Sequence, residues 1–336
     1  MSTVSLMSHT RFVVVGAGAI GTWLGARIAM AGHPVSVLAR GATLTALAEH
    51  GLRLDLDGQQ IAAPVRASDR AEDLGTQDAV LIAVKGDALP ALAPLLAPLI
   101  GPDTLIVPAM NGVPWWFMLG DSADHPHLPL TSVDPTGAIA AALPVDQVVG
   151  AVVHASVASA GPGHAVHKAG NRLILGEPHG ATGPRLQALA EVLGACGFAI
   201  ELSANIRQAI WYKLWGNMTM NPISAFTGAT CDRILDDDLV SGFVLAVMEE
   251  ARAIGDRIGC VITERGEDRG AVTRQLGAFR TSMLQDVDAG RPLEIDLLLS
   301  APREIAAHLG IATPCLDALT GLTRLFARTR GLYPPA

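Results

Sequence analysis

Three polar side chains recur at helical spacing within an apolar stretch of the sequence: Lys213, Asn217 and Asn221. Positions i, i+4 and i+8 lie along one face of a helix, which turns once in about 3.6 residues. The positions around them hold large apolar side chains, namely Trp211, Leu214, Trp215 and Met218. Because polar groups in apolar surroundings need partners, a cation with two amides there is typical of a binding site. The alternative is a narrow polar face exposed to water.

A second candidate is a glycine-rich turn after the apolar run 11–15, which consists of Gly16, Ala17, Gly18, Ala19, Ile20 and Gly21. In dinucleotide-binding folds, the first glycine of this spacing permits a tight turn and the second lets the backbone approach a pyrophosphate. The third brings the next helix close to the strand, and that helix directs its positive N-terminus at the phosphates. In a chain with 35 glycines, an ordinary glycine-rich turn is the alternative. The strand before the turn, the helix after it and a second strand at 34–39 favour dinucleotide binding.

The end of that second strand indicates which dinucleotide is bound. An NAD site usually carries Asp or Glu about 20 residues after the glycines, where it binds the ribose 2′-hydroxyl. Here no carboxylate is found, and Arg40 stands in its place. A guanidinium suits a phosphate dianion, so the sequence predicts NADP(H) as the cofactor. The alternative is an ordinary surface arginine at a strand end.

Polar residues also follow two later strands, which we predict at 78–84 and 104–108. Lys85 follows the first strand, and Asn111 with Gly112 follows the second. Ligands of open α/β sheets bind beyond the carboxyl ends of the strands, so this shared location favours a role in binding. A solvated lysine and a plain Asn-Gly turn are the alternatives.

A further polar cluster lies around two helices predicted at 281–288 and 296–309. Ser282 begins the first helix, and Glu294 precedes the second. Both residues have ordinary interpretations, one as a helix N-cap and the other as a charge matched to a helix dipole. From the residues alone, the structural role is the stronger expectation for Glu294.

The elements that would position these residues change in type along the chain. Strands alternate with helices in the first half, which argues for a doubly wound α/β sheet. Further strands are expected at 151–158, 171–176 and 199–202, with a helix at 183–197. Beyond them the periodicity is helical, at 205–220, 238–258, 265–278, 281–288, 296–309 and 314–330. The sequence therefore predicts two domains, residues 1–203 and residues 204–336.

The composition excludes several classes of protein. The 24 basic and 32 acidic side chains give a formal charge of −8, and only 17 % of the residues are charged. Disorder needs low hydrophobicity with high charge, and nonspecific nucleic-acid binding needs a basic stripe, so neither is expected. The most apolar segment, 88–100, contains three prolines and is shorter than the about 20 residues of a membrane span.

The cysteines and the amino terminus bear on the expected location. Residues 1–10 lack the apolar core of a signal peptide, and the four cysteines are scattered without metal spacing. We therefore expect reduced thiols, a cytoplasmic protein and no bound metal. His125 and His127 have no further ligand pattern near them.

These residues together resemble the ketopantoate reductase (2-dehydropantoate 2-reductase) family over most of the chain. The motifs that carry the resemblance are the turn 16–21, Val84-Lys85, Asn111-Gly112, the run from Lys213 through Asn217 to Asn221-Pro222, and the run from Ser282 to Glu294-Ile295-Asp296. The last two motifs together are much more specific than the nucleotide fingerprint.

The resemblance implies an N-terminal Rossmann domain, an all-helical C-terminal domain of the 6-phosphogluconate-dehydrogenase type and a substrate cleft between them. The implied reaction is the NADPH-dependent reduction of ketopantoate to pantoate in pantothenate synthesis. The implied partner is a small 2-oxo acid, with neither nucleic acid nor membrane. Members of the family often form dimers, so a homodimer is a further expectation.

The resemblance also implies a role for each matching residue. Lys213 resembles the general acid, which would bond the ketone oxygen and protonate it as hydride arrives at carbon. Glu294 resembles a carboxylate near the nicotinamide ribose and the substrate, which would also orient Lys213. Lys85 and Asn111 resemble contacts to nicotinamide, ribose or substrate, and Arg40 matches the 2′-phosphate arginine. The residues that resemble substrate contacts are Asn217, Asn221 and Ser282.

Some positions depart from the family pattern. Phe279 and Cys231 stand where ketopantoate-reducing members can carry asparagine, and the segment 114–135 is unusual and begins with aromatic residues. One alternative is therefore the same chemistry on a more apolar 2-oxo acid. An alternative of another class is an NADP(H)-binding sensor without turnover, against which the presence of both Lys213 and Glu294 argues.

Overall fold

The computed structural model describes residues 10–120, 125–275 and 277–335 of the chain. The described residues form two compact units, one within 1–110 and 136–209 and the other within 111–135 and 210–336. We call them the sheet unit and the helical unit. The predicted domain boundary at 203/204 lies just before helix α7 (Ile206–Thr227). The boundary between the two units instead falls within that helix, between residues 209 and 210. Residues 111–135, which the sequence assigns to the first domain, pack with the helical unit.

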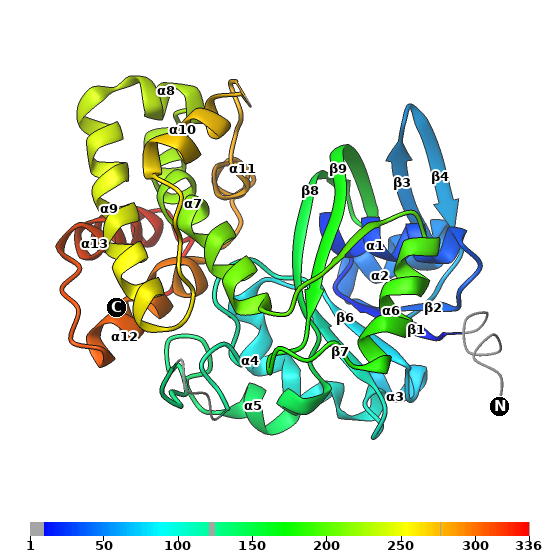
Figure 1. The fold of residues 1–336 in the computed structure, drawn as a ribbon. Coiled ribbons are helices and arrows are strands. Elements are labelled where there is room, and N and C mark those ends of the chain that lie inside the picture. Colours follow the sequence, from blue (N-terminus) through cyan, green and yellow to red (C-terminus); the bar gives the residue numbers. More distant parts are fainter. Residues whose placement is uncertain (1–9, 121–124, 276, 336) are drawn as a thin grey trace. The chain divides into compact units, whose positions relative to one another are not determined.

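A five-stranded parallel sheet forms the first layer of the sheet unit (Figure 1). Its strand order is β5-β2-β1-β6-β7, with β1 at Phe12–Val15, β2 at Val35–Leu38, β5 at Arg66–Ser68, β6 at Ala79–Ile82 and β7 at Leu105–Pro108. Every residue of β1 and β6 is buried, as expected for continuous apolar runs in strands covered on both faces. The doubly wound α/β fold is thus confirmed, and β1, β2, β6 and β7 lie where the sequence predicts strands.

The sheet unit also contains a second sheet, which includes the strands expected at 151–158, 171–176 and 199–202 and a hairpin at 52–63 that was not predicted. Its path is β10-β9-β3-β4, and β8 pairs with β9. These strands are β3 (Leu52–Leu56), β4 (Gln59–Ala63), β8 (Gly150–Gly161), β9 (His164–Gly176) and β10 (Ala199–Leu202). The β3–β4 hairpin turns at Asp57 and Gly58, which both have positive φ angles. An Asp-Gly pair after alternating apolar and polar residues is a hairpin signal that could have been recognised in the sequence.

Helix α1 (Ala19–Met30) packs against both sheets and joins their cores. Its Trp23 is fully buried, stacks on the ring of His167 and meets Phe198 edge to face at 5.0 Å. The other helical segments of this unit are α2 (Gly41–His50), α3 (Ala71–Leu74), η2 (Gly86–Ala88), α4 (Leu89–Leu92), η3 (Ala93–Leu99), α5 (Ala138–Ala142), η4 (Val145–Gln147) and α6 (Pro184–Ala195). The prolines of the segment 88–100 thus divide it into short turns.

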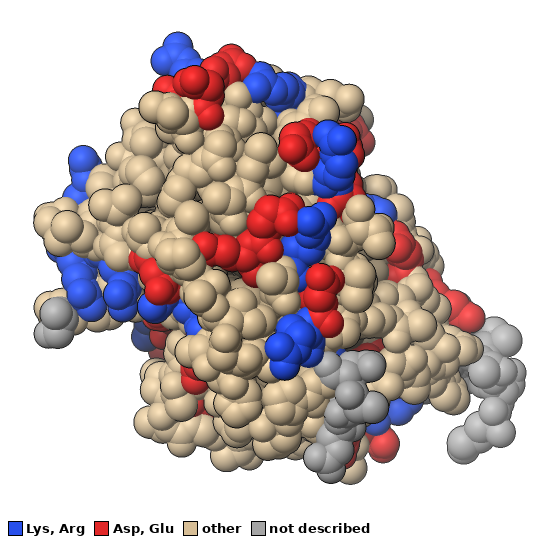
Figure 2. Space-filling model, turned by 60° about the vertical axis from the view of Figure 1, so that its left-hand side comes forward, with Lys and Arg blue, Asp and Glu red and all other residues tan. Residues whose placement is uncertain are grey.

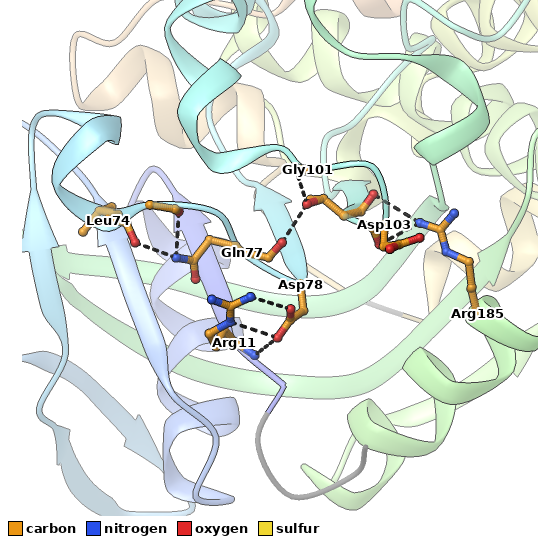
Figure 3. Close-up of polar contacts among 9 residues, drawn as sticks. Arg11, Leu74, Gln77, Asp78, Gly101, Asp103 and Arg185 are labelled. Atoms are coloured by element: carbon orange, nitrogen blue, oxygen red, sulfur yellow. Dashed lines mark hydrogen bonds and ion pairs between the residues drawn. The ribbon is translucent and has the colours of Figure 1, made fainter. Parts of the chain in front are cut away.

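Polar contacts fix the strands at their amino-terminal ends, as Figure 3 shows. Arg11, before β1, binds Asp78, before β6, through its backbone N–H at 2.8 Å and its guanidinium at 2.9 Å. Arg185 of α6 donates to the carbonyl of Asp103, before β7, at 2.8 Å. The loops that the sequence predicts to form a binding site lie at the opposite, carboxyl-terminal edge of the sheet.

The helical unit contains α7, α8 (Cys231–Asp236), α9 (Asp238–Arg257), α10 (Gly266–Arg274), α11 (Ser282–Asp288), the π-helical turn η5 (Asp296–Ser300), α12 (Ala301–His308) and α13 (Pro314–Thr329). Asn205 caps α7, because its Oδ1 accepts the Gln208 N–H at 3.0 Å. The helix was expected to end near 220, but it continues through Pro222 to Thr227. Ile223 and Ser224 are buried beyond the proline, and this packing offsets the lost hydrogen bond.

The aromatic residues of the segment 114–135 belong to the packed interior of the helical unit. Trp115, Trp116 and Phe117 are all at most 2 % exposed. Phe117 stacks on Trp211 of α7, with 5.9 Å between the ring centroids. Phe117 therefore supports α7.

The surface and the thiols agree with the composition. Figure 2 shows acidic and basic side chains interspersed among a larger uncharged area on the face in view. Among the described residues, no helix has both the length and the apolar character needed to cross a membrane. The four cysteines are free thiols.

Candidate active site

The ammonium group of Lys213 forms the centre of the site in the helical unit. Its Nζ donates a hydrogen bond to Oδ1 of Asn111 at 2.9 Å. Asn217 and Asn221 continue along the same face of α7 toward its carboxyl end, and Asn221 is buried. We call Lys213, Asn217 and Asn221 the lysine row. The structure thus brings Asn111 to this row from a segment far away in the sequence.

Two tryptophans on another face of α7 fix the orientation of this helix. The indole N–H of Trp211 donates to the carbonyl of Ala251 at 3.2 Å, and that of Trp215 donates to Met248 at 2.9 Å. Both carbonyls belong to α9, and both indoles are fully buried. Gly255 makes the first contact possible, because a Cβ at that position would lie 2.6 Å from Nε1 of Trp211. The two bonds fix the rotation of α7 about its axis and therefore the direction of the lysine row.

The π-helical turn η5 holds Asn111 in place. Because η5 departs from the α-helical pattern, the carbonyl of Leu297 accepts the Val113 N–H at 2.9 Å. Gly112 lies directly against that turn, since a Cβ there would stand 2.6 Å from the Leu297 carbonyl oxygen. Its φ of +83° also favours glycine. The backbone on the carboxyl side of Asn111 is thereby fixed, with its amide oxygen at Lys213.

Burial and one nearby charge set the protonation of Lys213. Removal of the ammonium from water is the larger effect and lowers its pKa to about 8, and the charge of Glu294 acts in the opposite direction. Glu294 stands between the buried residues Leu293 and Ile295, just before η5. A lysine with this pKa is mostly protonated at neutral pH and can still release its proton, as a general acid requires.

Ser282 has a different position from the one expected of a capping residue. Thr281 is the N-cap of α11, and its hydroxyl accepts the Leu284 N–H at 3.2 Å. Ser282 occupies the first helical position with an exposed side chain. Among the described residues, no hydrogen bond joins Ser282 to the lysine row. The interpretation of Ser282 as a cap is therefore wrong, and its role in binding stays a prediction.

The glycine turn lies at the carboxyl-terminal edge of the parallel sheet. The chain passes from β1 to β2 on one side and returns to β6 on the other, so this turn occupies the topological switch point. Gly16 has a φ of +90°, and a Cβ there would lie 2.6 Å from Cγ1 of Val84. At Gly21 a Cβ would collide with the carbonyl oxygen of Gly16. Both glycines are required by the local packing.

Gly18 differs from those two glycines, because a Cβ at that position would meet nothing within 4 Å. It is also the N-cap of α1, so its open side faces the region where the first backbone N–H groups of that helix are unsatisfied. An open cradle at a helix N-terminus fits the pyrophosphate of a dinucleotide.

Arg40 and Lys85 follow the strands on either side of this turn. The register pairs Val15 of β1 with Leu38 of β2 and with Ile82 of β6, so the three strand ends lie side by side. Arg40 is exposed, and no carboxylate among the described residues pairs with its guanidinium. Lys85 is half-buried and precedes the short helix η2. Both cations are thus placed beside the glycine turn.

A cavity of about 240 Å³ in the helical unit contains none of these residues. It lies among α7, α8, α9 and α10, and its lining includes Thr219, Met220, Val244, Met248 and Arg269. The residues of α7 that line it are different from the lysine row. Lys213 therefore does not line this cavity.

A parallel sheet with a dinucleotide turn at its switch point, in one chain with a helical unit that carries a buried lysine, defines a Rossmann-type oxidoreductase. Comparison with known families assigns both parts. Residues 12–180 match the family described as ketopantoate reductase PanE/ApbA, and residues 205–327 match its C-terminal domain. The chain belongs to the ketopantoate reductase family.

Individual relatives are similar to this chain over nearly its full length. A 2-dehydropantoate 2-reductase of Mesorhizobium japonicum is 41 % identical over 324 residues, which cover 96 % of this chain and 99 % of the relative. A crystal structure from Ralstonia solanacearum MolK2, provisionally described as a ketopantoate reductase, has a TM-score of 0.94 and 57 % identity and covers 97 % and 100 %. The 2-dehydropantoate 2-reductase of Methylococcus capsulatus has a TM-score of 0.81 at 28 % identity, with 95 % and 97 % covered.

Proposed function

We propose that this protein reduces 2-dehydropantoate (ketopantoate) to pantoate with NADPH, and that Lys213 is the general acid. The observation that carries the proposal is the desolvated ammonium of Lys213, held by Asn111 and close to the charge of Glu294. The family of the chain supports the reaction, and pantothenate synthesis is the process that this reaction serves.

Lys213 has the properties that the reduction of a ketone requires. Hydride addition to the carbonyl carbon places negative charge on the oxygen, and a positioned cationic donor stabilises that charge. The Lys213 ammonium would first donate a hydrogen bond to the ketone oxygen and then transfer the proton to it. Asn111 accepts one N–H of the ammonium, which limits the directions of the remaining two. The charge of Glu294 favours the protonated lysine before the reaction.

The amides of the lysine row supply donors and acceptors for the rest of the substrate. We assign Asn217, Asn221 and the exposed hydroxyl of Ser282 to the carboxylate and hydroxyl groups of the 2-oxo acid. Rigid positioning by a buried helix reduces the entropy that the reaction must otherwise overcome. Asn221 is the most buried of the three side chains and is therefore the most strictly positioned.

The sheet edge fits a nicotinamide dinucleotide. The turn from Gly16 to Gly21 and the N-terminus of α1 would hold its pyrophosphate. We assign the 2′-phosphate to Arg40, whose guanidinium is exposed beside the end of β2, and a contact near the nicotinamide to Lys85. When bound, the cofactor supplies the hydride for the ketone carbon.

Oxidation of NADPH in the presence of a panel of 2-oxo acids tests the proposal. We expect the highest kcat/KM with ketopantoate and much lower values with NADH as the donor. Faster reduction of an aryl or alkyl 2-oxo acid would overturn the substrate assignment but keep the reaction class. Tight NADPH binding without turnover of any acid would instead indicate a nucleotide-binding sensor.

One contact favours a more apolar 2-oxo acid as the second candidate substrate. The backbone N–H of Cys231 donates to the carbonyl of Phe279 at 3.0 Å, so the two apolar departures from the family pattern adjoin each other. Cys231 is buried and Phe279 is half-buried. The panel should therefore include 2-oxo acids with bulky apolar groups at the third carbon.

A further inference from the structure

The segment that follows α13 is attached to the stretch that carries Glu294. The Leu293 N–H donates to the carbonyl of Leu332 at 2.9 Å. The hydroxyl of Tyr333 donates to Oδ1 of Asp296 at 2.7 Å. Glu294 thus lies between two positions, 293 and 296, that are both bonded to the same distant segment.

This segment is itself well anchored. Leu332 is buried, and its N–H donates to the Ala327 carbonyl at 2.8 Å at the end of α13. The guanidinium of Arg328 lies over the ring of Tyr333 at 5.6 Å and donates to the carbonyl of Pro334 at 3.1 Å. The attachment to Leu293 and Asp296 therefore connects the Glu294 stretch to the body of α13.

The Tyr333–Asp296 bond is strong for a tyrosine contact. Asp296 Oδ1 also accepts the hydroxyl of Ser300 at 2.7 Å, so two hydroxyl groups donate to one carboxylate oxygen. Burial and the charge of Asp296 raise the pKa of Tyr333 to about 12, so the phenol keeps the proton that it donates. Hydrogen bonds with one charged partner are roughly twice as strong as neutral ones.

Asp296 is also the first residue of η5, the turn that fixes the Asn111 segment through Leu297. Glu294 and Asn111, the two groups that act on Lys213, are consequently supported by the same short stretch of backbone. Glu294 precedes Asp296 by two residues, and the Leu297 carbonyl follows it directly.

We infer that Tyr333 and Asp296 are positioning residues for the reduction. They hold Glu294, and the turn η5 that supports Asn111, at fixed positions relative to Lys213. This inference rests on the proposed function of Lys213. Neither residue is required to touch substrate or cofactor. Their contribution is geometric, so their loss should lower kcat more than it changes KM.

The test uses Y333F, which removes only the hydroxyl and keeps the ring beneath Arg328. We expect kcat with NADPH and the best 2-oxo acid to fall about tenfold, within the roughly 100-fold that a 1 Å misplacement can cost. In D296A kcat should fall at least as far. D296N keeps an accepting oxygen, so its kcat should lie between those of D296A and the wild type. S300A is the matched control, since it removes a bond to the same oxygen from within η5 and leaves the attachment to the segment after α13 intact.

A double-mutant cycle separates positioning from general destabilisation. In an E294Q background, Y333F should lower kcat further by much less than it does in the wild type, while its effect on Tm stays the same. Equal factors in both backgrounds would overturn the inference, as would an unchanged kcat in Y333F.

A second readout does not need turnover. The chain has three lysines, Lys85, Lys168 and Lys213, so 13C-labelled lysine gives few resonances to assign. In Y333F the pKa of Lys213 should fall in the same direction as in E294Q, because Glu294 is no longer held near it. An unchanged pKa in Y333F with a changed one in E294Q would refute the positioning role. Absence of turnover in the wild type would count against the proposed reaction alone.

Discussion

Lys213 and Asn111 are 102 residues apart in the sequence, yet the lysine ammonium donates to the asparagine amide oxygen at 2.9 Å. Asn111 reaches this position because its segment packs with the helical unit, against η5. The contact gives the buried ammonium a neutral acceptor that orients one of its N–H groups. Glu294 contributes through its charge.

Replacement of Lys213 should abolish most of the catalysis. In K213A the ketone oxygen loses its proton donor, and turnover should fall by about 10²–10⁴-fold, the usual contribution of a general acid. NADPH binding should be largely retained, since the glycine turn, Arg40 and Lys85 belong to the other unit. Steady-state kinetics with a parallel NADPH titration measures both. Activity within a few-fold of the wild type would exclude Lys213 as the acid.

The pH profile should report the protonation of Lys213. Reduction needs the protonated lysine, so kcat/KM for the 2-oxo acid should decline as the pH rises through about 8. Glu294 raises this pKa against the larger effect of burial, so E294Q should move the decline to lower pH. The measurement is kcat/KM against pH for both proteins. A decline that stays in place or moves to higher pH in E294Q would show that Glu294 does not act on this group.

The sequence predicted the lysine row, the glycine turn and the alternating strands because each depends on local spacing that a helix or a strand imposes. It could not predict how the Asn111 segment is supported, because the acceptor is a backbone carbonyl of Leu297, exposed by a π-helical turn. An apolar side chain carries no sign of that role. The attachment of Tyr333 to Asp296 likewise joins positions without a shared periodicity. The β3–β4 hairpin, in contrast, had a local signal in Asp57 and Gly58.

Arg40 should determine the preference between the two nicotinamide dinucleotides. R40A should weaken NADPH binding about 10- to 100-fold, which corresponds to about 1.5–3 kcal/mol for a hydrogen bond to a charged group. NADH lacks the 2′-phosphate, so its affinity should change little. Arg172, an exposed arginine of β9 that pairs with Glu201, gives the control R172A. An equal loss of affinity for NADPH and NADH in R40A would contradict the assignment.

Gly112 should be required both for folding and for the position of Asn111. In G112A the new Cβ would stand 2.6 Å from the Leu297 carbonyl, and alanine disfavours a φ of +83°. The segment must then shift away from η5, so Tm should fall by several degrees and kcat should fall as Lys213 loses its acceptor. Gly310 also has a positive φ, +70°, but a Cβ there would meet nothing within 4 Å. G310A therefore controls for backbone strain alone and should lower Tm while kcat stays near the wild-type value. If both variants keep full kcat, the support of Asn111 by η5 is not needed for catalysis.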